Sequence, residues 1–103
     1  MAELLLRERQ TKEGLLVSVC DSDCLGRTFE DGEVPLTVTE EFYGGEEAVE
    51  ADGEDVVEGL ARANVANLVG ERCIDVAVEA GIIDEETVLE VGETRHAQLH
   101  WLR

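Results

Sequence analysis

The stretch NVANLVGERCIDVAVEAG, residues 64–81, decides how this chain folds. In its second half, apolar residues recur at the spacing of one helix face, and Gly81 is a typical residue to end a helix. The apolar stripe consists of Cys73, Ile74, Ala77, Val78 and Ala80. The first half, 64–70, either continues a preceding helix or forms a short buried strand before Gly70. We favour the strand, which makes the whole stretch a strand followed by a helix.

The segments on either side predict more strands and a second helix. Residues 54–63, EDVVEGLARA, place apolar side chains at helical spacing. Apolar runs bounded by turn residues predict strands at 3–10, 14–21, 35–43, 86–92 and 96–102. The first two strands form a hairpin, and so do the last two. The stretches 21–33 and 44–53 are rich in Asp, Glu and Gly and indicate loops, with one helical turn allowed in the first.

Strands and helices therefore alternate through the middle of the chain, between two terminal hairpins. This pattern predicts a mixed α+β fold, in which two or three helices pack on a mixed sheet in one domain, 1–103. A chain of 103 residues can bury such a core without disulfides or metal. No leader peptide and no long apolar run is visible, so we expect a soluble cytoplasmic protein. Three cysteines form an odd set, which favours reduced thiols.

The charge of the chain is extreme: 25 acidic residues face eight basic ones, for a formal net charge of -17. The acids are spread along the chain, whereas an acidic tail for a basic partner is more often a block. We therefore favour adaptation to a salty cytoplasm over a role for the charge in binding. The spread is uneven, because residues 1–18 carry three bases and three acids, and 92–103 carry two bases and one acid.

Four segments, in this order, resemble the archaeal family known as domain of unknown function 424. They are LVSVCDSDCLGRTFEDGE at 16–33, EEFYGGE at 40–46, ANLVGERCIDVAVEAGIIDEETV at 66–88 and HAQ at 96–98. The resemblance implies a small single-domain archaeal protein, with a link to translation or RNA handling as an expectation. The candidate functional positions on this match are Asp21, Gly26, Phe42, Tyr43, Gly44, Gly45, Asn67, Gly70, Glu71, His96 and Gln98.

The last strand contains both histidines of the chain. On a strand, His96, Gln98 and His100 share one face, and Ala97, Leu99 and Trp101 share the other, which we assign to the core. Two histidines four residues apart on a strand are separated by roughly 13 Å and cannot share a metal ion. A site built from Cys20, Cys24, Cys73 and one histidine is conceivable, but only one close cysteine pair exists. We expect no metal and no cofactor, and the histidine face is either solvated or part of a site with other elements.

Two further motifs have structural and functional interpretations. In EEFYGGE we expect Phe42 in the core and Tyr43 half-buried with its hydroxyl in water, followed by a turn or a docking loop at 44–45. Asn67 and Gly70 indicate a tight strand-to-helix turn. Glu71 in the first helical turn already satisfies the helix dipole, which disfavours a bound phosphate there.

No P-loop, dinucleotide-binding or serine-hydrolase motif is present. We therefore expect a non-catalytic binding module with a protein or ribonucleoprotein partner, and neither a membrane nor DNA. The alternative is a small enzyme with a cleft near His96, Asp21 and Tyr43. A structure in which these three side chains converge on one pocket would favour the enzyme.

If the terminal strands pair, the basic residues of both chain ends gather along one border beside His96 and Gln98. These residues are Arg7, Arg9, Lys12, Arg95 and Arg103. They would then form a non-acidic patch for an anionic partner such as RNA. The alternative is that they pair with Glu3, Glu8, Glu13 and Glu93 in solvent, in ion pairs worth about 0–1 kcal/mol each.

The charge predicts that folding depends on salt. The screening length is roughly 10 Å at 0.1 M salt and roughly 3 Å at 1 M, so removing salt exposes the acidic residues to one another. We expect the melting temperature, measured by circular dichroism, to fall by many degrees when potassium chloride is lowered. A melting temperature that stays constant between about 0.1 and 2 M would contradict adaptation to salt.

Overall fold

The computed structural model describes residues 4–30, 35–45 and 47–100. The long strands are β1 (Leu4–Thr11), β2 (Gly14–Asp21), β6 (Val65–Val69) and β8 (Thr94–His100). The short strands are β3 (Thr28–Phe29), β4 (Leu36–Thr37), β5 (Val49–Ala51) and β7 (Leu89–Val91). The helices are α1 (Glu40–Tyr43), α2 (Gly53–Arg62) and α3 (Glu71–Glu79), with single 3-10 turns at Ser22–Cys24 and Glu85–Thr87.

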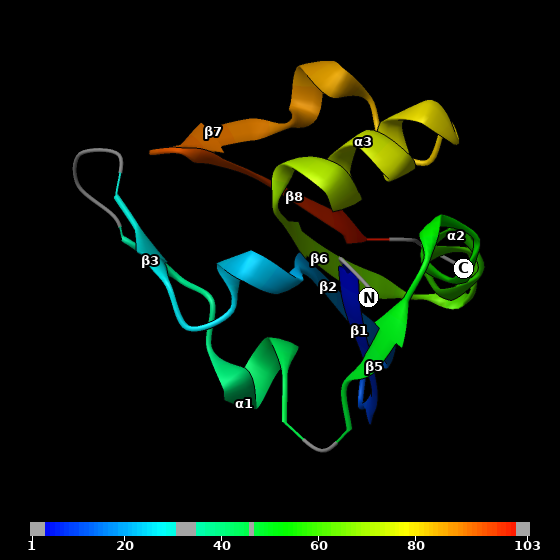
Figure 1. Ribbon diagram of the computed structural model, residues 1–103. Helices are drawn as coiled ribbons and strands as arrows, with labels where there is room; N and C mark the ends of the chain where they lie inside the picture. Colours follow the sequence, from blue (N-terminus) through cyan, green and yellow to red (C-terminus); the bar gives the residue numbers. More distant parts are fainter. Residues whose placement is uncertain (1–3, 31–34, 46, 101–103) are drawn as a thin grey trace.

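Six strands form one sheet in the order β5-β1-β2-β6-β8-β7, and β3 and β4 form a second, two-stranded sheet (Figure 1). The pair β2–β6 is parallel, and the other pairs of the large sheet are antiparallel. The class is therefore α+β with a mixed sheet, as the alternation of elements predicts. No helix in the described part of the chain has the length and apolar character needed to cross a bilayer.

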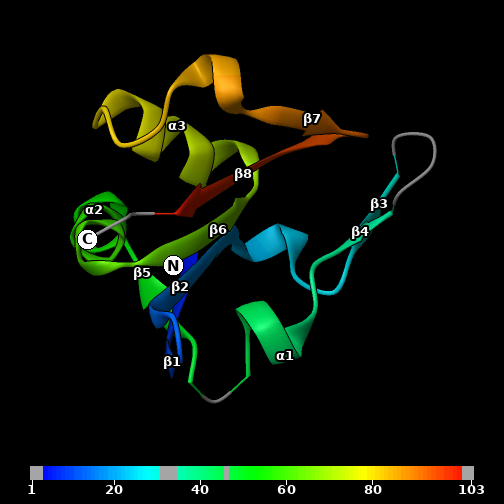
Figure 2. The same cartoon turned by 180° about the vertical axis from the view of Figure 1, so that it is seen from behind.

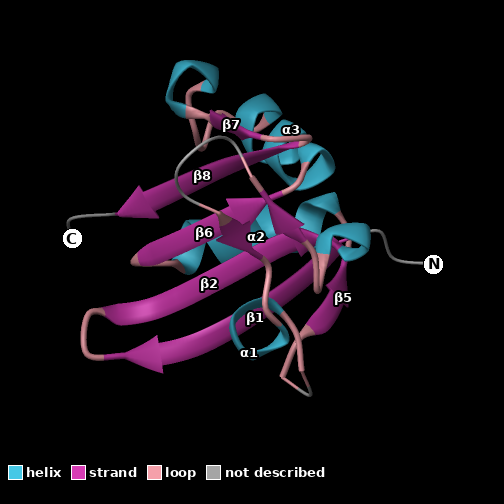
Figure 3. Ribbon diagram, turned by 90° about the vertical axis from the view of Figure 1, so that its left-hand side faces the viewer, coloured by secondary structure: helices cyan, strands magenta, loops and turns pink. Residues whose placement is uncertain are grey.

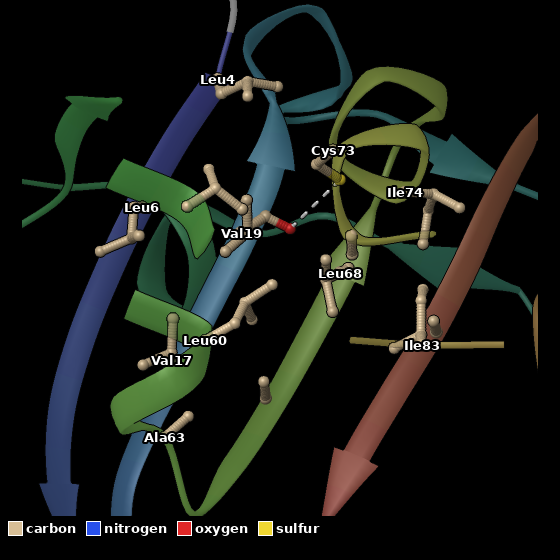
Figure 4. Close-up of a cluster of buried hydrophobic side chains, with 14 of the residues drawn as sticks. Leu4, Leu6, Val17, Val19, Leu60, Ala63, Leu68, Cys73, Ile74 and Ile83 are labelled. Carbon is tan, nitrogen blue, oxygen red and sulfur yellow. Dashed lines mark hydrogen bonds between the residues drawn. The ribbon is translucent and has the colours of Figure 1, made fainter. Parts of the chain in front are cut away.

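The helices α2 and α3 lie on the same face of the large sheet, as the two opposite views show (Figures 1 and 2). Between them and the sheet lies the main core, in which Leu60, Leu68 and Ile74 are completely buried (Figure 4). A smaller apolar cluster lies on the opposite face at one end of the sheet, where Phe29, Val38 and Tyr43 cover Cys20 and Val69.

The strand assignment for 64–70 is confirmed, since residues 65–69 form β6 at the centre of the sheet. One face of this strand, with Ala66 and Leu68, belongs to the main core; on the other face Val69 lies in the smaller cluster, while Val65 and Asn67 are half-buried. Apolar residues therefore occur on both faces of the strand, which is why the sequence pattern did not distinguish a strand from a helix. The two terminal hairpins and the helices at 54–63 and 71–81 are confirmed as well.

The prediction of one strand over 35–43 is wrong. Only Leu36–Thr37 pair, and the chain then turns into α1, because the Thr39 hydroxyl accepts a hydrogen bond from the Phe42 amide at 3.2 Å. The expected burial of the two aromatic residues is reversed for the same reason. Tyr43 is 4% exposed inside the smaller cluster, and Phe42 is half-buried at its edge.

The terminal strands do not pair. β2 and β6 lie between β1 and β8, because the chain crosses over through α2 and inserts β6 parallel to β2. Of the patch predicted from Arg7, Arg9, Lys12, Arg95 and Arg103, the four described members therefore do not gather along one border. Arg103 lies outside the described residues.

Candidate functional site

Four strands place alternate side chains on the sheet face opposite α2 and α3. Cross-strand neighbours there form three rows: Arg9–Leu16–Val65–His100, Arg7–Ser18–Asn67–Gln98 and Leu5–Cys20–Val69–His96. We call these twelve residues the open face. The assignment follows from strand alternation, since Leu6, Val17, Leu68 and Ala97 from the same four strands point into the main core.

The open face is covered at one end and exposed at the other. Cys20 and Val69 in the third row are fully buried beneath the smaller cluster. In the first two rows Arg9, Gln98 and His100 are exposed. Figure 3 shows α1 in front of the middle of the sheet, while no helix crosses the end that carries the β1–β2 turn. The sheet therefore presents a mixed surface to solvent, in which exposed Arg9, Gln98 and His100 surround half-buried Leu16, Val65 and Asn67.

The open face contains no acidic residue, although 25 of the 103 residues of the chain are acidic. The acids on these strands, Glu8 and Asp21, point to the helix side. Arg7, Arg9 and two histidines are instead present, together with Ser18, Asn67, Gln98 and five apolar residues. The twelve residues themselves thus carry no negative formal charge on a protein with a net charge of -17, although Glu40, Glu41 and Glu47 line the pocket beside Arg7 at the border.

The two arginines of the open face lie against the segment around α1. Arg7 forms an ion pair with Glu47 at 3.2 Å, and its side chain is only 14% exposed. Its Nε atom is buried and has no hydrogen-bond partner within the described residues. Arg9 donates a hydrogen bond to the carbonyl of Glu41 at 2.9 Å, and the residue as a whole remains exposed. Both side chains are oriented by these contacts, which lowers the entropy lost when they bind a ligand.

His96 is held in one tautomer by the backbone. Its Nδ1 atom lies 3.1 Å from the carbonyl oxygen of Leu68. A carbonyl oxygen only accepts, so in the neutral ring Nδ1 carries the hydrogen and Nε2 is left as an acceptor. His96 is half-buried, so its ring is an oriented polar group at the border between the covered and exposed parts of the open face.

Asp21 belongs to a different group of residues. Its carboxylate accepts hydrogen bonds from the backbone amides of Arg72 and Cys73, at 3.0 and 2.9 Å, and so caps the N-terminus of α3. The residue before the helix is Gly70, with a φ of 126°. A Cβ atom at Gly70 would lie 2.3 Å from Asp21 Cγ, so only glycine lets the carboxylate approach. This explains the tight turn predicted at Gly70, and it engages two of the helix N-terminal amides that a phosphate would need.

A polar pocket of about 220 Å³ lies beside Asp21. Ligand atoms of Asp21, Asp23 and Cys24 lie within 4.8 Å of one another there. Both Asp21 oxygens are already engaged by amides, and burial raises the pKa of the Cys24 thiol, which keeps it protonated. These groups therefore do not offer a metal ion a suitable ligand set.

The three residues of the enzyme alternative do not line a common pocket. Asp21 points to the helix side, whereas His96 is on the opposite face of the sheet. Tyr43 is buried in the smaller cluster, and burial raises the pKa of its hydroxyl far above the usual value. Neither His96 nor Tyr43 lines the pocket beside Asp21. The cleft predicted near these three residues is not formed.

The structure distributes the remaining candidate residues over several places. Asn67 and Gln98 lie in the middle row of the open face, and Gly44 and Gly45 line a shallow pocket beside Arg7 at its border. Glu71 lies in the first turn of α3, beside the Asp21 cap, and Gly26 donates to the Val38 carbonyl at 2.7 Å in a turn.

Of the basic candidates outside the open face, Lys12 is exposed in the β1–β2 turn and Arg103 lies outside the described residues. Arg95 points to the helix side, where it binds Asp75 and the carbonyl of Glu71. Ser18 and Val65 also belong to the open face and were not among the residues predicted for a site. Alternation along each strand predicts the face of that strand on which a residue lies. Only the order of the strands in the sheet shows that these residues are neighbours.

The fold and the open face together define a small α+β domain. It is strongly acidic, but one face of its sheet carries two arginines and no acidic residue. The chain belongs to the family described as protein of unknown function (DUF424), whose family model matches residues 8–102. A solved structure of an uncharacterized conserved protein from Methanopyrus kandleri is similar, with a TM-score of 0.74 and 27% identity, over 93% of this chain and 89% of that chain. No curated protein matches the sequence.

The Asp21 cap predicts the effect of an isosteric substitution. Asp21→Asn keeps the shape but leaves one acceptor oxygen and turns an NH2 group toward a backbone N–H. We expect the free energy of unfolding, measured with urea in high salt, to fall by about 1–2 kcal/mol. Asp23→Asn, two residues away and exposed, is the matched control and should change it by less than about 0.5 kcal/mol. Equal effects of the two substitutions would show that Asp21 is no cap.

The three cysteines are free and buried, so we expect unreactive thiols. Burial is the main cause that raises the pKa of Cys20, from 9.0 to about 12, with Cys24, Asp21 and Asp23 adding to the shift. Ellman's reagent should label no thiol of the folded protein at pH 8, and all three after unfolding in guanidinium. Rapid labelling of the folded protein would contradict the buried positions.

The raised pKa of Cys20 also sets a window for alkaline unfolding. In the unfolded chain this thiol ionises near pH 9, whereas in the folded protein it stays protonated up to about pH 12. Its contribution to stability is therefore complete below pH 9 and is lost as the pH rises from 9 to about 12. Cys20→Ser, whose hydroxyl does not ionise there, should flatten the fall in melting temperature across this window.

Proposed function

We propose that the protein is a non-catalytic binding module whose open face docks a ribonucleoprotein through its RNA. The observation that carries this proposal is the absence of acidic residues from the open face, on a chain that is acidic almost everywhere else. The proposal implies a cytoplasmic protein that works in high salt. It also implies that the acidic remainder of the surface keeps the molecule soluble and limits where an anion can bind.

The chemistry of the open face suits RNA. Arg9 offers a planar guanidinium that matches the oxygens of a phosphate. Asn67 and Gln98 can donate to and accept from the edges of unpaired bases, and the free Nε2 of His96 can accept from a ribose hydroxyl. The twelve residues include no Phe, Tyr or Trp, so the only rings that could stack on a base are the imidazoles of His96 and His100, and most of the proposed contacts are hydrogen bonds and ion pairs.

Salt has an unusual effect in this proposal. Salt normally weakens the binding of RNA, because phosphate contacts release counterions. Here the net charge of -17 repels RNA at long range, and salt screens that repulsion. Hydrogen bonds and the apolar contacts of Leu16 and Val65 persist at high salt. We therefore expect RNA binding that first strengthens as salt increases from low values.

The enzyme alternative has less support, because its three residues point away from one another. Asp21 already serves as a helix cap, and Tyr43 is buried. Activity would require other groups. A binding module therefore accounts better for the exposed residues of the open face than an enzyme does.

Charge reversal on the open face tests the proposal. Arg7→Glu with Arg9→Glu should reduce the RNA recovered with the protein, in native salt, by about tenfold or more, since it places two acids in the two exposed rows. Arg62→Glu with Arg72→Glu changes the net charge equally on α2 and α3 and is the matched control. RNA and proteins in the recovered material are identified by sequencing and mass spectrometry.

Arg7 is largely buried beside Glu47, so its reversal also risks destabilising the fold. Arg9→Glu with Gln98→Glu alters two exposed residues of the same face and serves as the second variant. Circular dichroism melting confirms that each variant is folded. If both open-face variants recover the same RNA as the parent and the control, the open face is not the binding surface.

A further inference from the structure

A groove between α2 and α3 lies on the side of the molecule opposite the open face. It encloses about 590 Å³ and has an apolar floor made of Gly53, Val57, Val76 and Ala80. The two helices approach each other at Gly53, where an added Cβ would lie 3.7 Å from Val76 Cγ2. The absence of a side chain at Gly53 therefore keeps the groove open at the start of α2. Val57 and Val76 are half-buried, so both still offer apolar surface to a ligand.

The rim of this groove is formed by three exposed glutamates, Glu54 and Glu58 on α2 and Glu79 on α3. Glu54 and Glu58 are four residues apart on one helix, where like charges repel each other. Glu79 is the last residue of α3, where a negative charge is unfavourable against the helix dipole. The nearest base along α2, Arg62, forms its ion pair with Glu8 at 2.6 Å. The rim therefore combines three negative charges, of which Glu54 is favoured by its place in the first turn of α2, whereas Glu79 opposes the dipole of α3.

We infer that the α2–α3 groove binds a basic amphipathic helix of a protein partner. A groove between two helices can hold the apolar face of a third helix, and lysine or arginine at the edges of that helix would neutralise the three glutamates. RNA does not fit here, because its phosphates would meet the acidic rim. The inference concerns a different surface from the open face and does not depend on the proposed function.

The two surfaces differ in what they select. The open face has no acid and suits an anion, whereas the groove has an acidic rim around an apolar floor and suits a cation with an apolar face. They lie on opposite sides of the sheet, so both partners can be bound at once. Such an arrangement would allow this protein to connect a basic protein to an RNA.

A synthetic peptide tests the inference directly. The probe is a fluorescein-labelled peptide of about 14 residues, roughly four helical turns, with leucine on one face and lysine on the other. A second peptide has the same composition in an order that forms no apolar face. Both are titrated with the full chain in about 0.5 M potassium chloride, which screens nonspecific attraction to an acidic protein. Fluorescence anisotropy gives the affinity, and chemical shifts of backbone amides show where the peptide lies.

Two triple variants separate the groove from the general charge of the protein. Glu54→Lys, Glu58→Lys and Glu79→Lys together should weaken the binding of the amphipathic peptide by about tenfold. Glu85→Lys, Glu86→Lys and Glu90→Lys change the net charge equally around β7 and should change the affinity by less than about twofold. Val57→Lys, which alters the floor, should also weaken binding. Shift changes are expected at Val57, Val76 and Ala80.

Several outcomes would overturn the inference. One is equal weakening by the two triple variants, which would show attraction to net charge alone. Others are equal binding of the reordered peptide, shift changes on the open face in place of the groove, and no measurable binding of the amphipathic peptide. Weakening confined to the groove variants, with shift changes at the groove floor, would support it.

Discussion

The carboxylate of Asp21 joins the two halves of this fold. It extends from the end of β2 and caps α3, which begins at the end of the neighbouring parallel strand β6. Gly70 makes this approach possible, since a side chain there would occupy the space of the carboxylate. The cap fixes the direction in which α3 leaves the sheet. Because α3 packs on the same side as α2, the main core forms on that side and the opposite face stays partly uncovered.

This one-sided coverage divides the molecule into surfaces of different chemistry. Helices, loops and the strand positions outside the open face carry the acids of the described residues. The open face carries apolar residues, a serine, two amides, two arginines and two histidines. The groove between the helices differs again, because the apolar residues at its floor are surrounded by glutamates. A single fold thus presents an anion-compatible face and a cation-compatible groove on opposite sides.

Much of the fold could be predicted from local patterns. Alternation over 3–10 and 14–21 indicates the first hairpin, and apolar spacing at 54–63 and 71–81 indicates the two long helices. The short strands β3 and β5 formed in segments predicted as loops. Two other failures occurred where one side chain decides the backbone. The Thr39 cap turns 40–43 into a helical turn, and the Asp84 carboxylate accepts from the Glu86 amide at 2.9 Å and starts a 3-10 turn where a strand was predicted. Such caps change the direction of the side chains that follow, which is why Phe42 and Tyr43 exchanged their expected places.

The sequence by itself determined the class of the fold, the acidic character of the protein, and the face of its own strand on which each residue lies. His96, Gln98 and His100 were placed on one face correctly, because alternation is a property of a single strand. Only the tertiary structure decided which strands are neighbours. The hairpin placed β2 beside β1, and the crossover through α2 inserted β6 between β2 and β8, which separated Arg95 from Arg7 and Arg9 and brought Ser18 and Asn67 into the row of Gln98. Strand order depends on how distant segments bury their apolar surfaces together, and no local pattern contains that information.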